Sequence, residues 1–183
     1  MGHFFYNMRS LRNISMIVWI FLFLCSSRAV RCEGWSDIKI RLLPDSSFAA
    51  IEYDESGEKY RRCPYRDANG DIDEEQLIYV LGVFEKGAWI DLKNKDRARK
   101  YLEKLYHRLR SRLSEKGLNQ PVNIRDATLV QLVSLPTIGP VLAVKVIQFR
   151  NSHPLFMHID DIKKVDGIST ATFNAIRHYI TCQ

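Results

Sequence analysis

Two short turns in the last third of the chain carry residues suited to holding an anion with backbone amides. Residues 135–140 read Leu-Pro-Thr-Ile-Gly-Pro, and residues 165–170 read Val-Asp-Gly-Ile-Ser-Thr. A glycine in such a turn lets the backbone approach a phosphate closely, because no Cβ stands in the way. Each turn leads into an apolar helical pattern, and the unpaired N–H groups at a helix N-terminus favour an anion. The sequence therefore indicates phosphate contact through the main chain.

The two turns belong to a repeated unit whose apolar positions recur at a fixed spacing. The matched positions are Leu132 with Ile162, Leu135 with Val165, Ile138 with Ile168, and Val146 with Ile176. A fixed internal period marks repeated structural units, and two copies make a pair rather than a solenoid. The spacing predicts two helix-turn-helix units in tandem, with an inward-pointing isoleucine at the centre of each turn.

Further short motifs follow one another around these turns. The segment opens with Val-Asn-Ile-Arg-Asp-Ala at residues 122–127, and Ala-Val-Lys-Val-Ile follows the first turn at residues 143–147. A connection reads Arg-Asn-Ser-His-Pro-Leu-Phe at residues 150–156, and Ile-Arg-His-Tyr-Ile closes the series at residues 176–180. In this order the motifs resemble the tandem helix-hairpin-helix domain of the competence protein ComEA family.

The resemblance implies a SAM-like helical domain that binds double-stranded DNA without reading its sequence. Phosphate contacts hold the nucleic acid but carry no base information, and such binding weakens as salt rises. The resemblance implies no cofactor and no small-molecule substrate; the partners would be duplex DNA and a membrane component of DNA uptake. The expected DNA-binding residues of hairpin one (residues 135–139) and the helix after it are Thr137, Ile138, Gly139, Val141 and Lys145. Those of hairpin two (residues 165–169) and its helix are Gly167, Ile168, Ser169, Thr170 and Ala171.

Both hairpins depart from the family pattern. Thr137 replaces the first glycine of hairpin one, and Ser169 replaces the second glycine of hairpin two. Ala175 stands where the first copy has Lys145. Acids beside hairpin two oppose an anionic partner; they are Asp160, Asp161 and Asp166. Hairpin one is therefore the expected phosphate site, and the alternative is a module of the same fold that binds another protein.

A long helix predicted over residues 95–114 carries the densest positive charge of the chain. Its apolar residues form one stripe, and nine basic residues stand against three acidic ones between Asn94 and Lys116. Arg108, Arg110 and Arg112 form a candidate secondary DNA-binding set on the basic face. The alternative is a helix face that is simply solvated.

The region before this helix reads as a small α+β unit. Alternation predicts a strand at 38–42, and two further candidate strands at 48–53 and 59–63 flank a turn at residues 55–58. Asp73 is a predicted helix cap, and Gln76 three residues later completes a capping box for a helix over residues 74–84. The acids from Asp67 onward do not follow the calcium-loop pattern, since its sixth position is Ile72 and its twelfth is Ile78. A turn and a helix cap explain them better than a cation site.

The first residues have the organisation of a secretory signal peptide. Arg9 and Arg12 precede an apolar run at residues 16–25, and small and polar residues follow up to Ala29. The run is too short for a typical spanning helix, so cleavage is favoured over a membrane anchor. Export would place the protein in the periplasm or another extracytoplasmic compartment. There Cys32, Cys63 and Cys182 could form disulfides, with one pair plus a free thiol or a Cys63–Cys182 pair both open.

The sequence thus predicts a mainly α protein with a signal peptide at residues 1–29. A small α+β domain, built from a short hairpin or sheet plus two helices, spans residues 33–118, and a tandem helix-hairpin-helix domain spans residues 119–183. No nucleophile, metal-ligand or carboxylate constellation suggests an enzyme or a metal site. The net charge of +6 favours a polyanionic partner. The expected function is exported, non-sequence-specific binding of double-stranded DNA during uptake in competence; the alternative is an exported structural or protein-interaction module.

Overall fold

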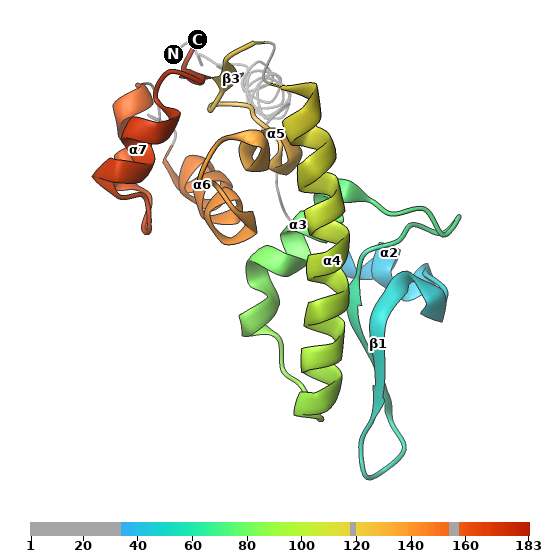
Figure 1. Cartoon of the computed structure of the whole chain (residues 1–183). Helices are drawn as coiled ribbons and strands as arrows, with labels where there is room; N and C mark the ends of the chain where they lie inside the picture. The colour runs from blue at the N-terminus through green and yellow to red at the C-terminus, as the bar shows by residue number, and fades with distance from the viewer. Residues whose placement is uncertain (1–33, 118–119, 154–157) are drawn as a thin grey trace, which may run out of the picture. The chain divides into compact units, whose positions relative to one another are not determined.

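The computed structural model describes residues 34–117, 120–153 and 158–183 (Figure 1). These residues fall within one compact unit and are mainly helical, which confirms the predicted fold class. In the part of the chain that is described, no helix is both long enough and apolar enough to cross a membrane. The predicted signal peptide lies outside the described residues, so export stays a prediction.

The first described helix, α2 (Asp37–Leu42), stands where the sequence predicted a strand. Alternation over residues 38–42 is too short to separate a strand from a helix. Ser36 favours the helix because its hydroxyl accepts a hydrogen bond from the N–H of Lys39 at 3.3 Å and caps the first turn. The strand prediction was wrong, and Ile38 and Leu42 remain exposed to solvent.

The predicted β-hairpin is confirmed. A short 3₁₀ helix, η1 (Asp45–Ser47), leads into strand β1 (Phe48–Tyr53), which pairs antiparallel with β2 (Lys59–Pro64). The carboxylate of Asp54 accepts hydrogen bonds from the N–H groups of Ser56 and Glu58 in the connecting turn. This side chain therefore replaces the missing main-chain acceptors of the turn.

The acidic segment after β2 forms a turn. One carboxylate oxygen of Asp67 accepts hydrogen bonds from the N–H groups of Asn69 and Asp71, both at 2.9 Å. Gly70 adopts a φ of 89°, which glycine tolerates because it has no Cβ. Among the described residues, no group of three or more His, Cys, Asp or Glu side chains is placed to hold a metal ion.

Helix α3 (Glu74–Val83) begins where the sequence predicts. The carboxylate of Asp73 accepts a hydrogen bond from the N–H of Gln76 at 2.8 Å, so the predicted cap is confirmed. The other half of the predicted capping box was wrong, because the Gln76 side chain accepts from the N–H of Trp35 instead. A competing donor from a distant segment therefore overrides the local motif.

The long basic helix is α4 (Leu92–Lys116), which follows the short 3₁₀ helix η2 (Phe84–Lys86) and is longer than predicted. Asp91 caps its start by accepting a hydrogen bond from the N–H of Lys93. Gly117 ends it with a φ of 65°, a conformation that favours glycine. One face of α4 packs inward and its basic residues lie on the others.

The C-terminal part contains two turn-centred helix pairs, as predicted. The first copy has two α-helices, whereas the first helix of the second copy is 3₁₀. A two-residue parallel strand pair, which the sequence analysis did not predict, joins the two ends of the domain. In order the elements are β3 (Val122–Asn123), α5 (Leu129–Ser134), α6 (Pro140–Ser152), η3 (Ile159–Lys164), α7 (Thr170–Ile176) and β4 (Ile180–Thr181).

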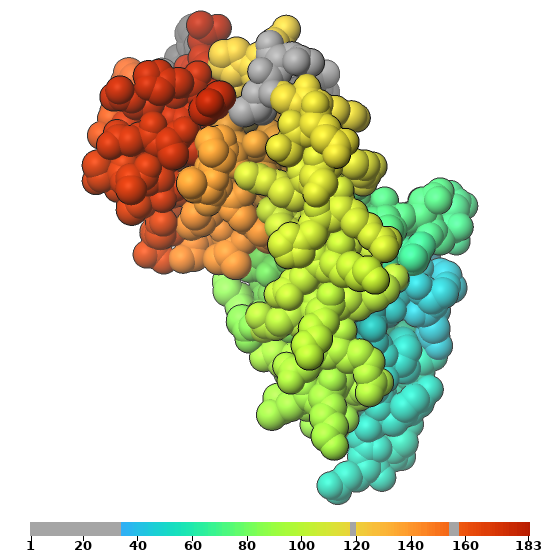
Figure 2. Space-filling model, viewed as in Figure 1, coloured from blue at the N-terminus to red at the C-terminus, as the bar shows by residue number. Residues whose placement is uncertain are grey.

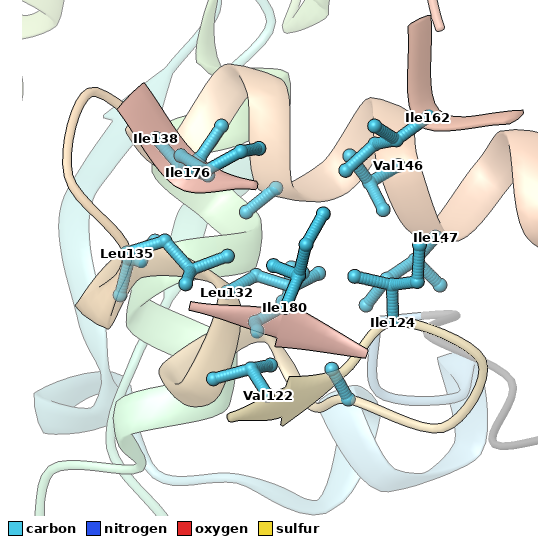
Figure 3. Packing of buried hydrophobic residues seen from close by; sticks show 14 of the residues in the cluster. Val122, Ile124, Leu132, Leu135, Ile138, Val146, Ile147, Ile162, Ile176 and Ile180 are labelled. Atoms are coloured by element: carbon cyan, nitrogen blue, oxygen red, sulfur yellow. The ribbon is translucent and has the colours of Figure 1, made fainter. Parts of the chain in front are cut away.

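The repeated apolar positions meet in one buried cluster (Figure 3). Both central isoleucines point inward as predicted, since Ile138 is 2% exposed and Ile168 is 7% exposed. Burial of this many aliphatic side chains supplies the main driving force for the domain. The labelled members in the figure are Val122, Ile124, Leu132, Leu135, Ile138, Val146, Ile147, Ile162, Ile176 and Ile180.

The packing is continuous across the predicted domain boundary near residue 118. Ile78 of α3 and Leu109 of α4 lie in the same cluster as the hairpin helices. The carboxylate of Glu75 accepts hydrogen bonds from the N–H groups of Leu129 and Val130 at 2.8 and 3.0 Å, and so caps α5 from outside the repeat. The division at residue 118 stays a prediction, and helices on its two sides share one core.

Cys63 and Cys182 are not linked to each other. Burial raises the pKa of the Cys63 thiol to about 12, which keeps it protonated and a poor nucleophile at neutral pH. Cys32 lies outside the described residues, so the pairing alternatives that include it stay open.

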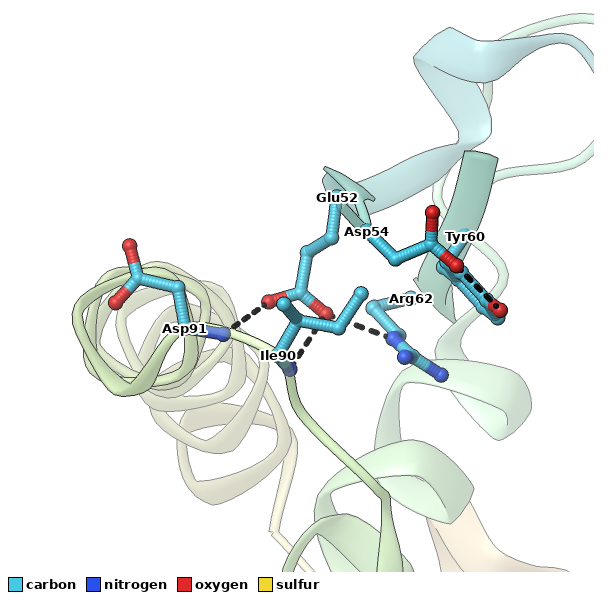
Figure 4. A network of polar contacts seen from close by, with 6 residues as sticks. All are labelled: Glu52, Asp54, Tyr60, Arg62, Ile90 and Asp91. Atoms are coloured by element: carbon cyan, nitrogen blue, oxygen red, sulfur yellow. Dashed lines mark hydrogen bonds and ion pairs between the residues drawn. The ribbon is translucent and has the colours of Figure 1, made fainter. Parts of the chain in front are cut away.

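A buried carboxylate connects the β-hairpin of β1 and β2 to the start of α4 (Figure 4). Glu52 is 3% exposed, and it accepts hydrogen bonds from the N–H of Asp91 at 3.0 Å, the Arg62 guanidinium at 2.9 Å and the N–H of Ile90 at 3.4 Å. Burial raises the pKa of Glu52, but these hydrogen bonds and the charge of Arg62 outweigh it and hold the pKa below the ordinary glutamate value. The charged form is therefore the stabilising one.

This arrangement predicts a stability loss in acid. Because the pKa is lowered on folding, the contribution of Glu52 is complete above the ordinary glutamate pKa and disappears as pH falls through the folded pKa. We expect Glu52→Gln to lower the free energy of unfolding by about 2 kcal/mol at pH 7 and by much less near pH 3. Urea unfolding at both pH values measures this, with exposed Glu55→Gln as the control. An equal loss at both pH values would show that the charge of Glu52 is not responsible.

Candidate phosphate-binding hairpins

Hairpin one is a tight turn held by its own main chain. The N–H of Ile138 donates to the carbonyl of Leu135, and the first helical hydrogen bond of α6 runs from the N–H of Ala143 to the carbonyl of Gly139. Thr137 occupies the left-handed region with a φ of 64°. Gly167, its counterpart in hairpin two, has a φ of 92°. The two turns therefore share one backbone geometry, and Thr137 adopts it although a β-branched residue is strained there.

The second glycine position of each hairpin does not require a left-handed backbone. Gly139 has φ −101° and ψ 179°, and Ser169 has φ −77° and ψ 166°, so both are extended. A Cβ built at Gly139 meets no atom within 4 Å. The serine in hairpin two therefore leaves the turn unchanged, and the glycine in hairpin one leaves open space in front of the backbone.

The N-terminus of α6 is open to an anion. Gly139 provides no side-chain cap, and Pro140 at the first helical position has no N–H. Helix geometry leaves the next N–H groups, those of Val141 and Leu142, without acceptors inside the helix. Val141 is 51% exposed, which places this end of α6 at the surface. These amides, together with that of Gly139, form the candidate phosphate site.

Hairpin two satisfies its own helix instead. The hydroxyl of Ser169 accepts a hydrogen bond from the N–H of Thr172 at 3.1 Å and caps α7. The predicted contact residues Thr170 and Ala171 are exposed in the first turn of this helix. Because the Ser169 hydroxyl already accepts from one amide at the N-terminus of α7, hairpin two has fewer N–H groups available to an anion than hairpin one.

Lys145 joins α6 to hairpin two rather than standing free. Its Nζ lies 2.6 Å from a carboxylate oxygen of Asp166, whose side chain is 91% exposed. The hydrogen bond and charge of Lys145 lower the pKa of Asp166. A Cβ at Gly167 would lie 2.8 Å from a methyl carbon of Leu142, so α6 and hairpin two are in close contact. The structure thus brings the candidate lysine beside hairpin two and gives it an acidic partner.

The three arginines of α4 have different surroundings. Figure 2 shows α4 side chains across the middle of the visible face. Arg108 is exposed, whereas Arg112 pairs with Glu74 at 2.7 Å. Arg110 donates to the carbonyls of Leu135 and Ile138 at 3.0 and 3.3 Å. The predicted set is therefore not one surface, because Arg110 is committed to hairpin one.

The predicted residues differ in what they could contribute. The side chains of Ile138 and Ile168 are in the core, so they could contribute only main-chain groups. Sequence reasoning did not identify the roles of Glu75 and Arg110, which act on the repeat from α3 and α4. Neither residue carries a local signal, since each bonds to backbone groups far away in the sequence.

Comparisons with known proteins agree with this geometry. The family described as "Helix-hairpin-helix motif" matches residues 118–181. ComE operon protein 1 of Bacillus subtilis (strain 168) is 38% identical over 68 residues, which cover 37% of this chain and 33% of that protein. The C-terminal part of the chain is a ComEA-like helix-hairpin-helix domain.

Other relatives share a similarly short segment. The endonuclease/exonuclease/phosphatase family domain-containing protein 1 of Rattus norvegicus is 36% identical over 63 residues, and that of Homo sapiens is 35% identical over 63 residues. Each match covers 34% of this chain and 11% of the relative. The chain thus matches a third or less of the length of these curated relatives. No solved structure matches the chain.

Proposed function

We propose that the chain is a non-catalytic protein that binds double-stranded DNA without sequence preference, with phosphates seated at hairpin one. The observation that carries the proposal is the uncapped N-terminus of α6 beside Gly139, where no Cβ blocks an approaching group. Main-chain N–H groups at a helix N-terminus suit a phosphate oxygen. The similarity to a ComE operon protein and the net charge of +6 support the same partner.

The proposal extends to an exported protein that receives DNA during uptake. It rests on the predicted signal peptide and on the resemblance to the ComEA family. A membrane component of the uptake apparatus is the further partner it implies. A fractionation experiment on cells that make the full-length protein tests this part, because an exported protein should be recovered outside the cytoplasm and shortened by the leader.

On α6, Lys145 lies about one helical turn beyond the candidate phosphate-binding amides and is paired with Asp166 of hairpin two. A phosphate approaching the first turn of α6 would compete with Asp166 for Lys145. Exposed ion pairs contribute little, so the pair can be exchanged for phosphate at small cost. Asp166 also carries a negative charge that repels the DNA backbone.

Two substitutions test the proposal. We expect Lys145→Ala to weaken duplex binding and to reduce the slope of log K against log salt by about 0.9, because one phosphate-bound cation is lost. We expect Asp166→Asn to strengthen binding by about threefold, because Lys145 gains freedom and a repelling charge is removed. Fluorescence anisotropy with a labelled duplex at several salt concentrations measures both.

The controls change the same charges elsewhere. Lys86→Ala removes an exposed lysine from η2, and Asp71→Asn removes an exposed acid from the turn before α3. If Lys145→Ala behaves like Lys86→Ala, Lys145 does not contact phosphate. If the wild-type protein does not bind duplex DNA even at low salt, the DNA proposal fails and the protein-interaction alternative takes its place.

A further inference from the structure

Hairpin one is held from outside the repeated motif by a single guanidinium. Arg110 lies on α4, 25 residues before Leu135 in the sequence, and its two terminal nitrogens reach the carbonyls of Leu135 and Ile138. The same side chain lines a surface groove with Ser134 and Pro136, between the end of α4 and the turn. Arg110 therefore spans the contact between the long helix and the candidate phosphate loop.

The contact fixes the direction in which an amide points. The carbonyl of Ile138 and the N–H of Gly139 belong to one peptide unit, which is planar and trans. In such a unit the N–H points opposite to the carbonyl. Because Arg110 binds the Ile138 carbonyl, the Gly139 N–H is directed away from α4. The space beside the Cα of Gly139 is also open, since a Cβ there would meet no atom within 4 Å.

We infer that Arg110 is a positioning residue, which orients the hairpin-one amides for phosphate from within α4. The inference rests on the proposed function and adds to it, because it places a determinant of DNA affinity outside the helix-hairpin-helix repeat. Two bonds from a planar guanidinium restrict the turn more than one bond would. A loop that is already ordered loses less conformational entropy when it binds its ligand.

Arg110→Gln tests the inference against direct contact with DNA. We expect duplex affinity to fall about fivefold or more at every salt concentration, with an unchanged salt slope, because hairpin amides release no counterions. A phosphate-contacting arginine would instead reduce the slope by about 0.9. Arg97→Gln removes the same charge from an exposed position on α4 and should change affinity little. Arg110→Lys keeps the positive charge and one donor nitrogen, and it should recover part of the loss.

Amide hydrogen exchange provides a readout that does not need DNA. In Arg110→Gln, exchange should accelerate at Ile138, whose N–H donates to the Leu135 carbonyl, while the corresponding residue Ile168 in hairpin two should keep its protection. Unchanged exchange in hairpin one overturns the inference. If the salt slope is also reduced by about 0.9, Arg110 contacts phosphate directly instead. If the wild-type protein does not bind DNA, the proposed function fails. The exchange result then still decides whether Arg110 orders the turn.

Discussion

Gly139→Val should weaken duplex DNA binding by about tenfold or more while the protein stays folded. The valine Cβ and methyl groups would occupy the space through which a phosphate must reach the amides of α6. Loss of charge-assisted hydrogen bonds costs about 1.5–3 kcal/mol, which corresponds to a tenfold or larger change in affinity. The extended backbone at this position is accessible to valine, and its Cβ meets no atom within 4 Å. The free energy of unfolding should therefore change by less than about 1 kcal/mol.

The size of the new side chain gives a graded test. Gly139→Ala should lie between the wild-type protein and Gly139→Val in affinity. Gln148→Val adds a valine to an exposed position farther along α6 and should leave binding unchanged. Anisotropy titrations and thermal unfolding, run on the same samples, separate binding from stability. Equal affinities across the whole series would exclude hairpin one as the phosphate site.

The hairpins could be predicted because their determinants are local. Glycine and proline mark the turns, and the matched apolar residues of the two copies all face one core. The cap at Asp73 could be predicted for the same reason, since it depends on one residue beside a periodic pattern. Thr137 shows the limit of this reasoning, because a threonine in place of glycine suggests a changed turn. The turn in fact keeps the backbone of its glycine-containing counterpart.

The interactions that define the site environment could not be predicted, because they join distant segments. Lys145 meets an acid 21 residues away, Arg110 bonds to a carbonyl 25 residues away, and Glu75 caps a helix 54 residues away. None of these pairs leaves a periodic or motif signal in a single sequence. The strand predicted over residues 38–42 failed for a different, local reason, because so short an alternation does not separate a strand from a helix and Ser36 caps a helix there.

The second large effect that we expect is on stability, and it comes from the close contact between α3 and α6. We expect Gly82→Ala to lower the free energy of unfolding by about 2 kcal/mol, although alanine favours helices over glycine. A Cβ at Gly82 would lie 2.4 Å from a methyl carbon of Val144 and 2.8 Å from the carbonyl oxygen of Pro140. The carbonyl belongs to the backbone at the start of α6, so the two helices must separate to admit it. The melting temperature should fall by about 4–8 °C.

The matched comparison is Gly139→Ala, which adds the same methyl group where there is space for it. A double-mutant cycle with Val144→Ala identifies the cause. Val144→Ala removes the nearer of the two clashing groups, so the double variant should be more stable than the sum of the single losses predicts. Strict additivity would mean that the cost at Gly82 does not come from contact with the Val144 side chain. A measured coupling would show that helices on the two sides of residue 118 are held together by direct packing, and that the start of α6, where the candidate amides lie, depends on both.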